Sequence, residues 1–183
     1  DTVRVSAGTY FDQLNFNGKD IVVEGENKET TIIDGSQNNG YGVVHFASGE
    51  DSTAVLSGFT LQNGYSLWGA GIRCEGNSSP ILKDLIITNN SAQGGGGMFI
   101  TENSEPTLIR VAIIDNSAYS YFGGGMYIKD YSNPKLINVT ISDNSAEMYG
   151  GGIYLHSSSP TLTNVTFNGN TAGSKGGGMH ISA

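Results

Sequence analysis

Apolar and polar residues alternate over short stretches along most of the chain, which is the period of a β-strand. From Pro80 onward the same apolar positions recur in four successive segments. They are Leu82, Leu85 and Ile87; Leu108, Val111 and Ile113; Leu136, Val139 and Ile141; and Leu162, Val165 and Phe167. A further pair of apolar positions follows each set: Met98 and Ile100, Met126 and Ile128, Ile153 and Leu155, and Met179 and Ile181. No stretch shows sustained helical spacing, so we expect an all-β protein with very little helix.

The four prolines of the chain mark the repeats, because Pro80, Pro106, Pro134 and Pro160 are 26, 28 and 26 residues apart. A fixed period of this length is typical of a solenoid whose units stack and cannot fold alone. The period continues upstream in degraded form, over 56–74, 21–46 and 3–16. We therefore predict a single domain over 1–183, with irregular N-terminal coils over 1–52 and regular repeats of about 26 residues over 53–183.

Three short strands and three turns fit one such repeat. When the units stack, each strand pairs in parallel with its copies roughly 4.8 Å above and below. Connections of this kind are right-handed almost without exception. The pattern thus predicts a right-handed parallel β-helix of about six to seven coils with three short strands per coil.

Several segments resemble known families. The glycine clusters GGGM and GGGI, combined with FNGN at 167–170 and its variants ISDN and IIDN, resemble the repeats of chlamydial polymorphic outer-membrane proteins. DTVRVSAGTY at 1–10, followed by NGKDIVVEG and TIIDG, is similar to the first coils of right-handed parallel β-helix proteins of the pectin-lyase-like superfamily. The resemblance covers essentially the whole chain. It implies secreted or surface bacterial proteins, of which some are adhesive and some act on polysaccharides.

Composition and charge exclude several classes of function. The net charge is −8, and the nine Lys and Arg residues are scattered singly, so no basic stripe exists for a nucleic acid. No apolar run is long enough to span a membrane. The single cysteine, Cys74, cannot form an internal disulfide. An acidic, Gly-, Asn- and Thr-rich chain fits an extracellular or bacterial cell-surface location.

Many repeated residues have a structural explanation. One asparagine follows each proline by ten residues, and we expect stacked amides that hydrogen-bond along the column. This predicted ladder consists of Asn90, Asn116, Asn144 and Asn170. The glycines that follow suit turns with positive φ or close backbone approach. Cys74 occupies an inward position and is expected to be buried as a small apolar residue.

The outward position between each later apolar pair is where we expect a site. Along the column it holds His45, Arg73, Phe99, Tyr127, Tyr154 and His180. We predict a stacked aromatic stripe that faces solvent and binds a glycan or a protein. The predicted ligand-binding residues are Phe99, Tyr127, Tyr154, Trp68, Tyr121, Tyr149 and Arg73. The alternative is that the stripe shields the sheet or packs beneath the variable turns.

Catalytic residues are sought near the same stripe. Lys129, Asp130 and His156 fall on adjacent coils, where Asp130 could hold His156 while Lys129 contacts an acidic sugar. No catalytic motif of the family is visible, so a non-catalytic binding, adhesive or structural module is favoured. The alternative is a polysaccharide lyase or glycoside hydrolase that acts on acidic polysaccharide. No metal or cofactor is expected, although Ca²⁺ would fit a lyase.

The two ends of the chain show no capping segment, because Asp1 begins within a predicted strand and the final strand closes the last repeat near Ala183. Stacked β-columns normally protect their terminal edges. We therefore expect a segment of a longer protein, with adjoining domains or end-to-end self-association at its ends.

Overall fold

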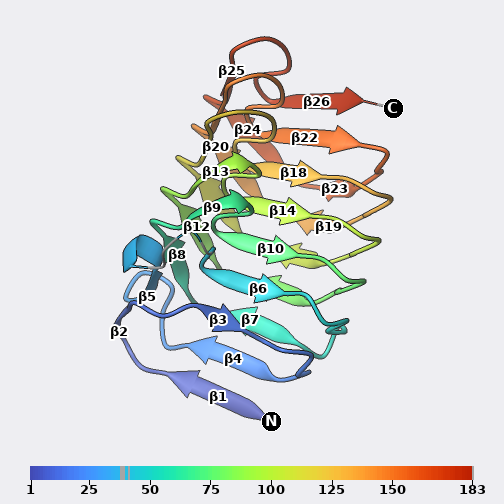
Figure 1. The fold of residues 1–183 in the computed structure, drawn as a ribbon. Helices are drawn as coiled ribbons and strands as arrows, with labels where there is room; N and C mark the ends of the chain where they lie inside the picture. The colour runs from blue at the N-terminus through green and yellow to red at the C-terminus, as the bar shows by residue number, and fades with distance from the viewer. Residues whose placement is uncertain (38–39, 41, 183) are drawn as a thin grey trace.

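The computed structural model describes residues 1–37, 40 and 42–182. Within these residues the chain winds through seven coils into a column of parallel sheets, with the N-terminal and C-terminal coils at opposite ends (Figure 1). Every strand pairs in parallel with the matching strand of the coil below or above. The predicted parallel β-helix is thus confirmed.

Four sheets, here called A to D, form the sides of the column. Sheet A contains β1 (Thr2–Val5), β4 (Val22–Gly25), β7 (Val55–Ser57), β11 (Ile81–Lys83), β15 (Thr107–Ile109), β19 (Lys135–Ile137) and β23 (Thr161–Thr163). Sheet B contains β2 (Gly8–Tyr10), β5 (Thr31–Asp34), β8 (Thr60–Gln62), β12 (Ile86–Thr88), β16 (Ala112–Ile114), β20 (Thr140–Ser142) and β24 (Thr166–Asn168).

The other two sheets complete each coil. Sheet C contains β3 (Leu14–Asn15), β6 (Val44–Phe46), β10 (Ile72–Cys74), β14 (Met98–Ile100), β18 (Met126–Ile128), β22 (Ile153–His156) and β26 (Met179–Ser182). Sheet D contains β9 (Tyr65–Trp68), β13 (Ser91–Gly94), β17 (Ser117–Ala118), β21 (Ser145–Ala146) and β25 (Thr171–Ala172). The helix described in the structure is a single 3₁₀ turn, η1 (Gly35–Gln37). In the part of the chain that the structure describes, no helix is long and apolar enough to cross a membrane.

Sheet D is the one departure from the predicted coil. Three strands per coil describe the first two coils, but the last five add a short fourth strand between sheets B and C. Small residues pair there, as in Ser91 with Ser117 and Ala92 with Ala118. Because these strands are short and lack an alternating apolar pattern, periodicity does not reveal them.

The column is filled by the inward positions that the sequence pattern indicates. Leu56, Leu82, Leu108 and Leu136 stack in register on sheet A and are fully buried. Cys74 is also fully buried, and burial raises the pKa of its thiol. The thiol therefore acts as a small apolar group and is not a nucleophile.

The four asparagines lie at the turn between sheets B and D and form a hydrogen-bonded ladder. Nδ2 of Asn90, Asn116 and Asn144 each donates to Oδ1 of the next asparagine, at 3.0, 3.0 and 2.9 Å. The same oxygens accept the backbone N–H of Asn90, Asn116 and Asn144 from the coil below, at 3.1, 3.0 and 3.1 Å. Each amide thereby satisfies buried backbone groups that the turn leaves without a partner.

The glycines beside this ladder allow the backbones of adjacent coils to approach closely. Gly123 has φ of 68°, a conformation that glycine adopts without steric cost. A Cβ at Gly125 would lie 2.6 Å from the carbonyl oxygen of Gly152 in the next coil. Side chains are excluded here because they would push the coils apart.

A second ladder lies inside the turn between sheets C and A, and the pattern analysis missed it. Ser78 N–H donates to Ser104 Oγ, and Ser104 N–H donates to Ser132 Oγ, both at 3.1 Å. Ser78 Oγ in turn donates to the buried carboxylate of Glu50 at 2.8 Å. A serine stands two residues before every proline of the chain, and this signal could have revealed the ladder.

Glu50 is 1% exposed and ends the serine ladder at its N-terminal side. Burial acts to raise the pKa of Glu50, but hydrogen bonds from Gly18 N–H at 2.9 Å, Ser48 N–H at 3.0 Å and the Ser78 hydroxyl outweigh it, so the pKa is lowered. The ionised carboxylate thus joins three coils.

The terminal coils expose residues that are buried elsewhere in the column. Val3 at one end and Leu162 and Ile181 at the other are exposed, with 68% of Ile181 accessible. Partners at these ends stay a prediction.

Replacing Asn116 by alanine is expected to lower the free energy of unfolding by about 3 kcal/mol, because buried backbone and amide groups in two coils lose their partners. Urea denaturation followed by circular dichroism measures this change. Asn168→Ala is the matched control, since Asn168 is exposed, and its effect should stay within about 0.5 kcal/mol. Equal effects of the two changes would contradict the structural role of the ladder.

Glu50→Gln is expected to lower the stability of the protein at neutral pH. It should also make the stability depend less on pH in the acidic range. The folded-state pKa of Glu50 lies below its unfolded value, so its contribution is present above the unfolded pKa and is lost as pH falls through the folded pKa. Thermal unfolding from pH 7 to pH 3 tests this. The exposed Glu29→Gln should reproduce the unmodified profile. If Glu50→Gln loses as much stability between pH 7 and pH 3 as the unmodified protein does, the assignment is refuted.

Candidate functional site

The outward column on sheet C has the register that the sequence predicts. Arg73 pairs with His45 on one side and with Phe99 on the other. Tyr127 then pairs with Phe99 and Tyr154. His180 pairs with Tyr154 and completes the column. Residues from six strands are therefore stacked at successive levels of one face.

The aromatic part of this column does not face solvent, and that part of the expectation is wrong. Phe99, Tyr127 and Tyr154 are only 4%, 9% and 7% exposed. Each ring meets its neighbour edge to face, with centroids 5.3 Å apart for Phe99 and Tyr127 and 5.2 Å apart for Tyr127 and Tyr154. The stripe is buried because the loops that follow sheet D fold over it, which is the alternative that the pattern left open.

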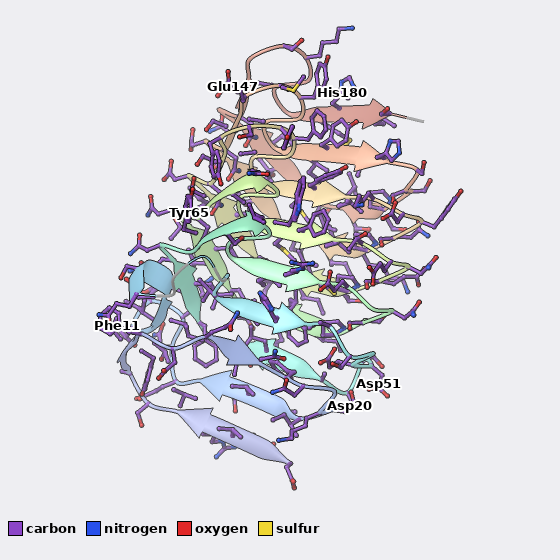
Figure 2. All side chains as sticks on the ribbon, viewed as in Figure 1. Phe11, Asp20, Asp51, Tyr65, Glu147 and His180 are labelled. Carbon is purple, nitrogen blue, oxygen red and sulfur yellow. The ribbon has the colours of Figure 1, made fainter. Side chains whose placement is uncertain are left out.

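Trp68 at the end of β9 covers the stripe together with Phe122 and Tyr149, which lie on the loops after β17 and β21, and the three form a second hydrophobic cluster with it. Phe122 stacks on Tyr154 with centroids 4.4 Å apart, and Tyr149 stacks on His180 at 4.8 Å. Figure 2 shows these loops with their side chains beside the strands of sheet C, with Glu147 on one loop and His180 on the last strand. The loops and the sheet thus form a unit outside the main core.

The outer surface of β9 and of these loops remains accessible. Tyr65, Leu67, Tyr119, Tyr121 and Met148 are all exposed. Tyr65 and Tyr119 stack nearly parallel at 5.6 Å. Tyr121 stacks on Trp68 with ring centroids 5.9 Å apart. Burial and the adjacent Tyr65 raise the pKa of Tyr119 to about 12.

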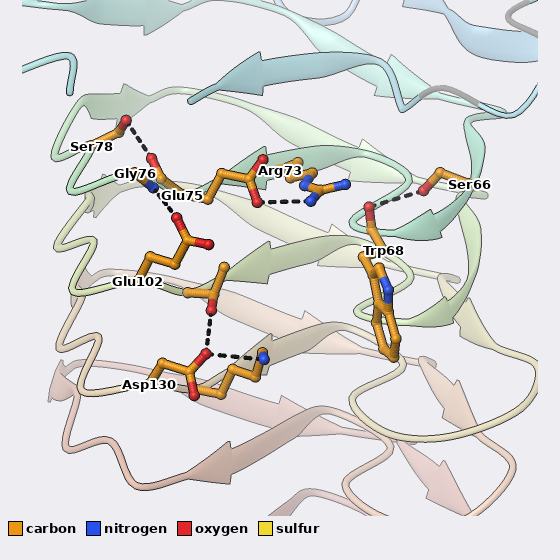
Figure 3. Close-up of polar contacts among 10 residues, drawn as sticks. Ser66, Trp68, Arg73, Glu75, Gly76, Ser78, Glu102 and Asp130 are labelled. Atoms are coloured by element: carbon orange, nitrogen blue, oxygen red, sulfur yellow. Dashed lines mark hydrogen bonds and ion pairs between the residues drawn. The ribbon is translucent and has the colours of Figure 1, made fainter. Parts of the chain in front are cut away.

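A cleft of about 250 Å³ opens beside Trp68 on the outward face of sheet C. Its lining consists of Trp68, Arg73, Glu75, Phe99, Thr101, Glu102, Tyr127, Lys129 and Asp130. Arg73, Phe99 and Tyr127 form the floor, since each is the central residue of its strand. Figure 3 shows Trp68 on one side and Glu75, Glu102 and Asp130 on the other, with Arg73 between them.

The charged side of the cleft is organised by two ion pairs. Arg73 Nη2 donates to Glu75 Oε2 at 2.8 Å (Figure 3). Lys129 Nζ lies 2.9 Å from Asp130 Oδ2 and 5.8 Å from the centre of the Phe99 ring. Thr101 Oγ1 also donates to Asp130 Oδ2 at 2.8 Å. The hydrogen bond from Lys129, and then that from Thr101, holds the pKa of Asp130 below its usual value.

Two further groups near the floor are shifted by burial. Burial, followed by the neighbouring Tyr154 and Asp130, raises the pKa of Tyr127 to about 12. Burial and the positive charge of Arg73 lower the pKa of His45, against a smaller opposing effect of Glu75. Both side chains are therefore neutral near pH 7.

The structure does not form the catalytic group expected from Lys129, Asp130 and His156. Asp130 Oδ2 is taken by Lys129 and Thr101, and within the described residues no hydrogen bond joins Asp130 to His156. His156 lies at the end of β22 and does not line the cleft. The expectation that Asp130 holds His156 is thus wrong, because Asp130 turns toward the coil below it and not toward the coil above.

Only some of the predicted ligand-binding residues line the cleft. Trp68, Arg73, Phe99 and Tyr127 line the cleft, whereas Tyr154 and Tyr149 lie outside it in the covered cluster. Thr101 and Glu102 were missed. Glu102 occupies the position of Asp130 one coil earlier, so the repeat register could have found it. Across the parts of the chain that the structure describes, no group of three or more His, Cys, Asp or Glu residues could hold a metal ion.

Tyr154→Ala is expected to lower the free energy of unfolding by about 3 kcal/mol, because it leaves a cavity between Phe122 and Tyr127. Thermal and urea unfolding measure the loss. Tyr131→Ala serves as the control, since Tyr131 is 71% exposed, and it should change stability by less than about 0.5 kcal/mol. A stable Tyr154→Ala protein would show that the covered cluster does not act as a core.

The comparisons with known proteins agree with this architecture. A family model described as the right-handed beta helix region matches residues 21–183. No curated protein and no solved structure matches the chain. The fold is the one expected for a member of the pectin-lyase-like superfamily. The chain belongs to the right-handed β-helix family.

Proposed function

We propose that the chain is a β-helix binding module whose cleft on sheet C holds a glycan. The observation that carries this proposal is the composition of the cleft, in which the indole of Trp68 lies across from a wall of carboxylates, a lysine and a threonine. Sugar rings have apolar C–H faces and polar rims. An aromatic face opposite hydrogen-bonding groups suits both surfaces of such a ring.

Neighbouring side chains hold both walls of the cleft in place. Trp68 packs against Phe99 with ring centroids 5.4 Å apart and against Tyr121 at 5.9 Å. The polar wall is held by the two ion pairs and by the bond from Thr101 to Asp130. Because these groups are already ordered, a ligand would lose little affinity to their immobilisation.

The covered aromatic residues have a supporting role in this proposal. Tyr154 and Tyr149 hold the loops on sheet C, and Tyr121 holds Trp68. Phe99 and Tyr127 present only their remaining accessible edges to the cleft. Of the aromatic residues expected to bind a ligand, Trp68 is the one that offers a ring to it.

A polysaccharide lyase or glycoside hydrolase is the second candidate, since three carboxylates line the cleft. A hydrolase needs one carboxyl group protonated as a general acid. Here Glu75 is paired with Arg73, and Asp130 is paired with Lys129 and has a lowered pKa. Because both carboxylates have cation partners and the pKa of Asp130 is lowered, which disfavours Asp130 as a general acid, the arrangement supports binding more than glycosidic cleavage.

The proposal includes an extracellular or cell-surface location and an adhesive use of the column. The acidic, Gly-rich composition with one buried cysteine supports it. A protein ligand is the other outcome for the same cleft.

Ligand binding in the cleft is expected to change the intrinsic fluorescence of the protein, because Trp68 is the single tryptophan of the chain. Titration with soluble oligosaccharides should shift or quench this emission. Calorimetry should then show at least about a tenfold loss of affinity in Trp68→Ala, the loss expected when a stacking ring is removed.

Phe11→Ala is the control for that experiment, since Phe11 is an exposed aromatic residue of the first coils, away from the cleft (Figure 2). The Phe11→Ala variant should bind oligosaccharides with the same affinity as the unmodified protein. If every oligosaccharide leaves the fluorescence and the calorimetric signal unchanged, the glycan proposal fails. Release of reducing or unsaturated sugars during the titration would favour the enzyme instead.

A further inference from the structure

The cleft is lined by more negatively charged side chains than positively charged ones. Three carboxylates, Glu75, Glu102 and Asp130, line it together with two cations, Arg73 and Lys129. Each cation is paired with one carboxylate at 2.8 or 2.9 Å. Glu102 is left over, and the cleft has one net negative charge. This arrangement is poorly suited to an acidic polysaccharide, because both cations are already neutralised.

Glu102 lies in the middle of the polar wall. It is exposed, and its Oε2 accepts the backbone N–H of Gly76 at 3.1 Å. Among the described residues no Lys, Arg or His forms an ion pair with it. Its position is fixed by the register, since Glu102 stacks between Gly76 and Asp130 on successive coils. The carboxylate therefore has a defined place and free acceptor capacity.

Trp68, on the opposite side of the cleft, also favours a positively charged ligand. The faces of aromatic rings attract cations, and tryptophan does so most strongly. Lys129 already makes use of this property above the Phe99 ring. The face of Trp68 and the carboxylate of Glu102 are thus two attractive groups for a ligand cation, on two sides of one cleft (Figure 3).

We infer that the cleft prefers glycans that carry a free protonated amino group, with Glu102 as the counter-charge and Trp68 as the stacking face. This inference rests on the proposed glycan-binding function and specifies its ligand class. Uronic-acid polymers are rejected by the unpaired carboxylate. Neutral sugars bind through Trp68 alone and more weakly.

The test compares three soluble probes of similar length by calorimetry: a glucosamine oligomer, its fully N-acetylated counterpart and an oligogalacturonide. The first two share a backbone and differ in the charged amine. The glucosamine oligomer should bind about tenfold more tightly than the acetylated oligomer, as expected for a charge-assisted hydrogen bond. In Glu102→Gln this preference should fall to about one.

Glu105→Gln is the matched control, since it removes the same charge from an exposed glutamate outside the cleft. It should keep the tenfold preference, which excludes a general attraction of cations to an acidic protein. Trp68→Ala should weaken all probes that bind.

The outcomes separate the two proposals. Equal affinity for the amine and the acetylated probe, with loss of both in Trp68→Ala, overturns the inference and leaves the glycan site intact. Tighter binding of the oligogalacturonide, or equal effects of Glu102→Gln and Glu105→Gln, also overturns it. Binding of none of the three probes overturns the inference, and the proposed function fails as well when every other oligosaccharide also leaves the Trp68 fluorescence unchanged.

Discussion

Parallel pairing of each coil with the next is the constraint on which the whole structure depends. Every strand inside the column takes its hydrogen bonds from the levels above and below, so a residue type at one position meets its counterpart in the next coil. Inside the column this places polar side chains where no water reaches them. The Asn90 to Asn170 ladder and the serine ladder ending at Glu50 show the result, because each polar group is satisfied by the equivalent group one coil away.

The same constraint acts on the outside of the column. Outward residues of sheet C are stacked in one line, and any aromatic residue there meets another aromatic residue in the adjacent coil. A line of such rings would expose a large apolar surface. The loops after sheet D remove most of it by placing Phe122 and Tyr149 over the rings. The column therefore has two cores, one inside the coils and one beneath the loops.

The cleft arises where this second core ends. Arg73 takes the outward position one coil before Phe99, so the aromatic line stops and a charged residue begins. Trp68 at the end of β9 lies against Phe99 and Tyr127, and the space beside it is bordered by the residues that follow β10, β14 and β18. The site thus combines the end of an apolar line with three successive polar turns.

The amino-acid sequence by itself determined the fold, the register and the ladder, because a repeat specifies which residues are equivalent and parallel stacking makes equivalent residues neighbours. Arg73, Phe99 and Tyr127 could be placed on one face in this way. The serine ladder and Glu102 were also accessible to the same reasoning, since they occupy repeated positions. The sequence could not show the fourth strand of Ser117 and Ala118, which has no apolar alternation.

Only the tertiary structure decided which outward residues are accessible and which carboxylates are paired. Exposure of Tyr154 depends on the path of the variable loop that carries Phe122, and no repeat constrains that path. The partner of Asp130 depends on side-chain direction, which turns it toward Thr101 and Lys129 and not toward His156. Stacking specifies the level at which a residue lies, whereas loop conformation and side-chain geometry determine what that residue can touch.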